Sequence, residues 1–184
     1  PVQADDSSEL IDLLQDENKP GDAAAKYEQA MYFDPESALA KLKYAVVYEK
    51  VNPDVSVETL KKVIAAKPEY LIAYKYLGRS YQKSGKYNSA IESYNTYFTD
   101  GQFKEKDMEY LTSLAQSYYF TDQFQQSIEV LDKGLAMEPN NFVLNRLRMY
   151  NASKVNDKEN GLAIADKFFK LSTTGSDRFI YQDY

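Results

Sequence analysis

The side chains that carry most enzyme chemistry are absent from this sequence or stand where a structural role explains them. The chain has no Cys and no His, which excludes thiolate nucleophiles, cysteine zinc sites and the commonest general base. A serine and a lysine can act as nucleophile and base, and Ser84 and Lys86 stand close together. They lie in the stretch SGK between two helical patterns, where these residue types are ordinary in turns. We therefore interpret them as part of a helix turn.

Two groups of acidic residues also suggest chemistry and also have simpler explanations. Glu105, Asp107 and Glu109 could act as acid and base if their surroundings separated their pKa values. They flank the start of a helix expected near Asp107, where acidic side chains favour the helix dipole. Residues 16–22 have part of the spacing of a calcium loop, but Pro20 stands where a side-chain ligand is needed. We predict no catalytic site, no metal and no cofactor, and so a protein that is not an enzyme.

The composition is that of a soluble globular protein with little affinity for nucleic acid. Hydrophobic residues make up 43% and charged residues 27% of the 184-residue chain. No apolar run approaches the roughly 18 residues that suggest a membrane span. The net charge is −6, and residues 1–35 contain nine acidic residues against two lysines. Because the chain is acidic and has no basic run, we predict no binding to nucleic acid.

Large, small and aromatic residues recur at a fixed spacing that indicates paired helices. A large residue, a small residue, two others and a tyrosine follow one another at Leu77–Tyr81, Leu114–Tyr118 and Tyr44–Tyr48. The apolar residues around them have the period of an amphipathic helix. Short breakers, such as residues 52–54, 84–86 and 121–123, separate the patterns, so neighbouring helices must be antiparallel. We expect Gly78 to face Ala90 on the partner helix, so that the two backbones approach closely.

This arrangement resembles the tetratricopeptide repeat (TPR), a helix pair of 34 residues with small, aromatic and proline residues at set places. The repeats fall at approximately 4–37, 38–70, 71–104, 108–141 and 142–175. The resemblance implies an all-α fold, a right-handed TPR superhelix (α-α solenoid) of about five helix pairs, as a single domain over 1–184. Residues 176–184 look like the start of a further repeat. We therefore expect a fragment of a longer protein, whose truncated, apolar C-terminal end favours self-association.

The resemblance also implies where a partner binds. In the family, contacts come mainly from the first helix of each pair, which lines the concave side. The matching positions of this sequence are Lys75, Arg79, Gln82, Lys83, Thr112, Gln116, Tyr119, Arg146 and Tyr150. Arginine and aromatic residues often dominate interface energies. We expect a non-catalytic scaffold that binds a peptide or partner protein, partly acidic, in this groove.

Two alternatives stay open. The chain could be a glycan-binding envelope protein, because tyrosine rings can stack on sugars, and exposed, coplanar faces on Tyr119 and Tyr150 would favour this. It could also be the regulatory segment of a larger multidomain protein. The tyrosine-rich, cysteine-free sequence begins at Pro1 rather than Met and resembles TPR proteins of the bacterial cell envelope. We therefore favour a periplasmic or other envelope location, after removal of a signal peptide, over a cytoplasmic one.

Overall fold

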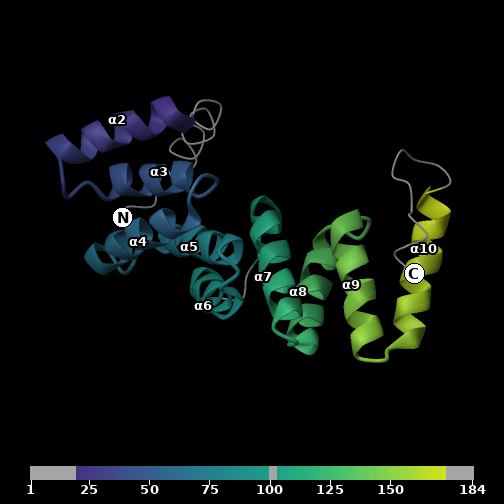
Figure 1. Ribbon diagram of the computed structural model, residues 1–184. Helices are drawn as coiled ribbons and strands as arrows, with labels where there is room; N and C mark the ends of the chain where they lie inside the picture. The colour runs from purple at the N-terminus through teal and green to yellow at the C-terminus, as the bar shows by residue number, and fades with distance from the viewer. Residues whose placement is uncertain (1–19, 100–102, 173–184) are drawn as a thin grey trace. The chain divides into compact units, whose positions relative to one another are not determined.

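The computed structural model describes residues 20–99 and 103–172, and every regular element in them is a helix. The elements, shown in Figure 1, are α2 (Pro20–Phe33), α3 (Ala38–Tyr48), α4 (Pro53–Ala66), α5 (Leu71–Lys83), α6 (Tyr87–Tyr97), the 3-10 turn η1 (Glu105–Asp107), α7 (Met108–Phe120), α8 (Phe124–Met137), α9 (Phe142–Lys154) and α10 (Lys158–Ser172). The prediction of an all-α chain is confirmed. The further repeat and the self-association expected at 176–184 lie outside the described residues.

The chain divides into two compact units, residues 1–100 and residues 101–184. Within the first unit, each helix from α2 to α6 packs against the next one along the chain. Within the second unit, α7 to α10 do the same, and α7 also contacts α9 (Figure 1). The helices α3 and α4 lie within the expected repeat 38–70, α5 and α6 within 71–104, and α7 and α8 within 108–141.

Three helix turns share one backbone geometry. The helices α5, α7 and α9 each have 13 residues. Each is followed, after its C-cap, by a residue with positive φ: Gly85 at 72°, Asp122 at 58° and Asn156 at 57°. One residue later a backbone N–H donates to the carbonyl five residues back, at 2.8 Å from Lys86 to Tyr81, 2.9 Å from Gln123 to Tyr118 and 2.8 Å from Asp157 to Ala152. This is the Schellman motif, which satisfies carbonyls at a helix end. The breakers at 84–86 and 121–123 are therefore copies of one turn, and the same turn follows α9.

Side-chain caps begin several of the helices. Asn52 accepts a hydrogen bond from the backbone N–H of Val55 at 3.4 Å, and Pro53 occupies the first turn of α4. Asn141 accepts from the backbone N–H of Leu144 at 3.1 Å and so begins α9. Proline and short polar residues favour these positions because the first N–H groups of a helix lack internal partners.

Small residues set the separation of the helices within a pair. A Cβ atom added to Gly78 of α5 would lie only 2.7 Å from Cδ1 of Tyr94, which is fully buried in α6. The side chain nearest to Gly78 is therefore the ring of Tyr94, one turn beyond the Ala90 that we expected. In the next pair, the hydroxyl of Ser127 donates to the backbone carbonyl of Ala115 at 2.8 Å. Both contacts need a short side chain where the two helices meet.

We predict that Gly78→Ala destabilises the protein although alanine is the better helix former. The added methyl group would overlap the ring of Tyr94, and overpacking of this kind costs about 1–3 kcal/mol. A gain of roughly 1 kcal/mol in helix propensity offsets part of this cost, so we expect a net loss of about 1 kcal/mol in thermal or denaturant unfolding. Gly21→Ala is the matched control, because no atom lies within 4 Å of the added Cβ there. Equal stability of the two variants would contradict the prediction.

Candidate functional site

Ser84 and Lys86 form a structural contact and not a nucleophile with its base. The hydroxyl of Ser84 donates to Oδ1 of Asp54 at 3.1 Å, and Nζ of Lys86 lies 2.9 Å from the same oxygen. The hydrogen bond that Lys86 donates to Asp54 raises the pKa of Lys86 above its ordinary value. Lys86 therefore keeps its proton at neutral pH and cannot accept one from Ser84. The contact ties the α5–α6 turn to the first turn of α4.

Among residues 20–99 and 103–172, no three acidic side chains gather closely enough to hold a metal ion. None of the described helices is long and apolar enough to cross a membrane.

Three of the predicted groove residues form a row of positive charge along α5. Lys75, Arg79 and Lys83 are spaced by four residues and so share one face of the helix. The side chains of this row are not equally accessible, because Lys75 is only 4% exposed. Its Nζ lies 5.4 Å from the ring centroid of Tyr76 and 5.3 Å from that of Tyr97. Lys75 is thus embedded among aromatic rings of its own unit.

The other two charges of this row meet a carboxylate from the preceding helix pair. Glu49 follows the last residue of α3 and is 1% exposed. Its two oxygens lie 2.6 Å from Nε of Arg79 and 2.6 Å from Nζ of Lys83. Arg79 and Lys83 therefore already pair with an anion inside the unit, while the neighbouring Gln82 is half-buried.

Three other predicted residues meet in one pocket of the second unit. The pocket has a volume of about 410 Å³ and lies between α7 and α9, which are in contact. It is lined by Gln116, Tyr119, Phe120, Leu147 and Tyr150. On α7, Tyr119 and Phe120 follow Gln116 by three and four positions, and on α9 Tyr150 follows Leu147 by three, so each set lies on one side of its helix. The pocket is mostly aromatic and aliphatic, with one amide.

An arginine fixes one wall of this pocket. Nε of Arg146 donates to the hydroxyl of Tyr150 at 3.0 Å, and the guanidinium carbon lies 5.6 Å from the centroid of the same ring. These two contacts orient the Tyr150 ring and place a positive charge beside it. Arg146 does not itself line the pocket.

The opposite wall is fixed by edge-to-face aromatic packing. The ring centroid of Tyr119 lies 5.8 Å from that of Phe120 and 5.6 Å from that of Phe124, at interplanar angles of 77° and 65°. Aromatic pairs prefer this arrangement. Thr112 stands one turn before Gln116 on α7, and its hydroxyl donates to the carbonyl of Met108 at 2.8 Å instead of reaching the pocket.

The structure thus separates the predicted residues into two sets that the sequence treats alike. The α5 set is buried or engaged, whereas Gln116, Tyr119 and Tyr150 share a pocket with Arg146 beside it. Two residues that adjoin the predicted ones were missed. Leu147 forms part of the pocket and is marked in the sequence only by its spacing of three from Tyr150. Glu49 stands at the end of α3, the first helix of its repeat, where the family pattern places groove residues in other repeats. That position could have marked Glu49 in the sequence.

The comparisons with known proteins identify the repeats. Residues 77–99 and 109–141 match the tetratricopeptide repeat family. No curated protein sequence matches the chain. Among solved structures, MamA from AMB-1 is 17% identical, with a TM-score of 0.77 over 90% of this chain and 98% of that chain. MamA from residue 41 to its end, from Desulfovibrio magneticus RS-1, is 13% identical, with a TM-score of 0.78 over 92% of this chain and 96% of that chain. A kinesin light chain from P. anserina with TPR-like repeats is 13% identical, with a TM-score of 0.71 over 90% of this chain and 93% of that chain. At these identities the likeness concerns the fold.

We predict that Glu49→Ala destabilises the first unit by about 2–3 kcal/mol. The change leaves Arg79, whose side chain is only 13% exposed, without its carboxylate, and breaking a buried pair from one side is costly. Glu58→Ala is the control, because its pair with Lys61 is exposed on both sides and such pairs contribute less than about 1 kcal/mol. Urea unfolding of both variants measures the difference. A loss no greater for Glu49→Ala than for Glu58→Ala would contradict the role given to Glu49.

Proposed function

We propose that this chain, whose fold is that of a tetratricopeptide repeat protein, is a non-catalytic interaction scaffold that binds a peptide or partner protein between α7 and α9. The tetratricopeptide fold supports protein–protein interaction in general. The observation that favours this particular place is the pocket of about 410 Å³ that brings Gln116, Tyr119 and Tyr150 together. These residues come from the first helices of two successive helix pairs, which is where the family resemblance expects a partner.

The lining of the pocket indicates what it would hold. Tyr119, Phe120, Leu147 and Tyr150 offer aromatic and aliphatic carbon to an apolar side chain, and Gln116 offers an amide to a peptide backbone. Arg146 adds positive charge beside Tyr150, which would favour a carboxylate next to the apolar anchor. The guest that fits best is an extended peptide with a leucine or aromatic anchor and an acidic neighbour. A location in the bacterial cell envelope rests on composition alone and stays a prediction.

The glycan alternative has less support from the same residues. Stacking on a sugar uses an open ring face. Tyr119 is half-buried and packs against Phe120 and Phe124, while one face of Tyr150 meets the guanidinium of Arg146. Both rings are therefore engaged by neighbours within the unit, which favours a peptide that enters the pocket over a sugar that lies across it.

A peptide selection tests the proposed site. We expect the full chain to enrich, from a displayed library of random peptides, sequences with an apolar anchor beside Asp or Glu. Tyr150→Ala should weaken the best peptide at least tenfold, or about 1.4 kcal/mol, as is usual for a central aromatic anchor. Isothermal titration calorimetry gives the dissociation constants of both forms.

Leu162→Ala is the matched control for this selection. Leu162 belongs to the same unit, is 57% exposed and does not line the pocket, so its truncation should leave peptide affinity unchanged. Selected peptides that bind Tyr150→Ala as tightly as the wild type would remove the pocket from the proposal. Binding to oligosaccharides that is lost in Tyr119→Ala, with no peptide enriched, would favour the glycan alternative instead.

A further inference from the structure

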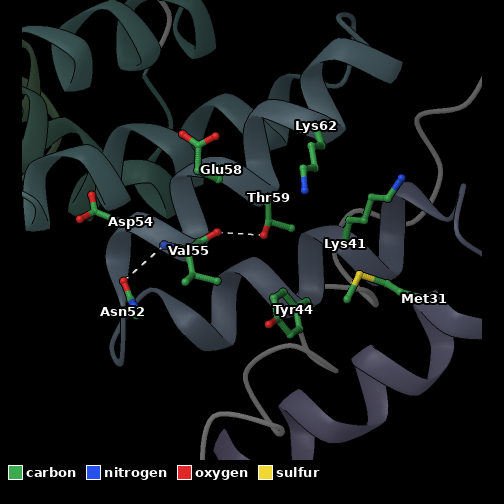
Figure 2. A pocket seen from close by; sticks show the side chains of 9 residues that line it. All are labelled: Met31, Lys41, Tyr44, Asn52, Asp54, Val55, Glu58, Thr59 and Lys62. Carbon is green, nitrogen blue, oxygen red and sulfur yellow. Dashed lines mark hydrogen bonds between the residues drawn. The ribbon is translucent and has the colours of Figure 1, made fainter.

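A second pocket, with a volume of about 620 Å³, lies in the first unit between α2, α3 and α4 (Figure 2). Helix α2 contributes Met31, and α3 contributes Lys41 and Tyr44. The remaining lining residues come from α4 and its N-cap: Asn52, Asp54, Val55, Glu58, Thr59 and Lys62. None of these residues belongs to the groove expected from the family. The pocket is independent of the one between α7 and α9, because it uses other helices and other residues.

The charges around this pocket are distributed unequally. Figure 2 shows the two carboxylates, Asp54 and Glu58, toward one end and the two lysines, Lys41 and Lys62, toward the other. The carboxylates at the first end already have cationic partners in the protein. Oδ1 of Asp54 lies 2.9 Å from Nζ of Lys86, and this hydrogen bond lowers the pKa of Asp54 below its ordinary value. Oε1 of Glu58 lies 3.2 Å from Nζ of Lys61.

The two lysines at the other end have no such compensation. In the part of the chain that the structure describes, no carboxylate forms an ion pair with Lys41 or Lys62. Both side chains line the pocket. The pocket therefore presents two positive charges to a guest, and its negative charges are already paired.

The polar side chains between the two ends form hydrogen bonds within the unit. The pocket surface between the two ends is therefore largely carbon. The hydroxyl of Thr59 donates to the carbonyl of Val55 at 2.8 Å, and Asn52 caps α4. The hydroxyl of Tyr44 donates to Oε1 of Glu28 at 3.2 Å, and its ring stacks on that of Tyr48 with centroids 4.4 Å apart. What remains for a guest is the side chains of Met31 and Val55 and the ring of Tyr44.

Two exposed aromatic side chains stand at the end of α2, next in sequence to the pocket residue Met31. Tyr32 and Phe33 directly follow Met31 in sequence, and they are 81% and 76% exposed. Their rings pack edge to face with centroids 5.6 Å apart. Large aromatic side chains gathered at one exposed place mark interaction surfaces more often than chance placement does.

We propose that this pocket is a second docking site, for a polypeptide segment that carries carboxylates beside an aliphatic or aromatic side chain. The carboxylates would pair with Lys41 and Lys62, and the apolar side chain would pack against Met31, Tyr44 and Val55. A small inorganic anion would use the lysines and leave the carbon surface in water. The combination of uncompensated positive charge with an apolar wall is therefore the reason to expect a peptide.

The test uses a defined probe and the full chain. The probe is the blocked peptide Asp-Glu-Leu-Leu-Asp-Glu, titrated into isotopically labelled protein and followed by two-dimensional NMR. We expect the largest shift changes at Val55, Thr59 and the methyl group of Met31. The double variant Lys41→Gln, Lys62→Gln should raise the dissociation constant at least fivefold, which one surface ion pair of about 1 kcal/mol supplies. The uncharged peptide Asn-Gln-Leu-Leu-Asn-Gln should bind the wild type correspondingly more weakly.

The matched control removes the same charge elsewhere in the unit. Lys26 and Lys67 are exposed and do not line the pocket, so Lys26→Gln, Lys67→Gln should leave the affinity unchanged. If both double variants bound the probe equally weakly, net charge alone would explain the loss of affinity, and the proposal would be overturned. Shift changes confined to other residues would also overturn it, as would displacement of the peptide by tripolyphosphate with shifts at the lysines only. Tyr150→Ala should leave the shift changes at Val55, Thr59 and Met31 as they are in the wild type. Binding of the probe between α7 and α9 would instead shift residues of those helices, so the two sites are tested separately.

Discussion

The closeness of two helices within a pair is the constraint on which the other features depend. In α5 and α6 it exists because Gly78 leaves room for the buried ring of Tyr94. In α7 and α8 it exists because Ser127 is short enough to bond the backbone of Ala115. A pair held at this distance behaves as one rigid element, because a close-packed interior is hardly compressible. The pocket between α7 and α9 has fixed walls because each of these helices is held in place by a neighbour behind it.

The sequence predicted the repeat, the helix pairs and the turn positions because these depend on spacing within one segment. Gly85 in the stretch SGK and Asn52 before Pro53 could be interpreted without any knowledge of tertiary contacts. The partner-binding residues were harder to predict, because availability depends on what a neighbouring repeat contributes. Lys75 is buried by aromatic rings, and Arg79 is paired with Glu49, which lies thirty residues earlier. Among the described residues, the predicted positions form a pocket where the neighbouring helix supplies carbon, as Leu147 of α9 does opposite Gln116 and Tyr119 of α7.

Ion pairing also decides which of the charges can act on another molecule. The net charge of −6 suggests an acidic surface, yet it says nothing about where charge is uncompensated. Glu49 neutralises two cations of α5, and Asp54 neutralises Lys86. The two pairs of Glu49 compensate cations that the family pattern marks for a partner, namely Arg79 and Lys83. Within the described residues, Lys41 and Lys62 have no such partner, and they lie in a pocket that the pattern does not mark.

The turns after α5, α7 and α9 are closed by backbone hydrogen bonds within each turn, and the residue at positive φ is Gly, Asp or Asn. No side chain from another repeat is needed to form them, so the sequence of each turn is sufficient to specify its geometry. The stability of a stacked array is approximately the sum of its units and their nearest-neighbour contacts. A helix pair of this kind can therefore be duplicated or lost in evolution as one genetic block, while the remaining pairs keep their shape. The surfaces that bind partners can then diverge repeat by repeat on an unchanged frame.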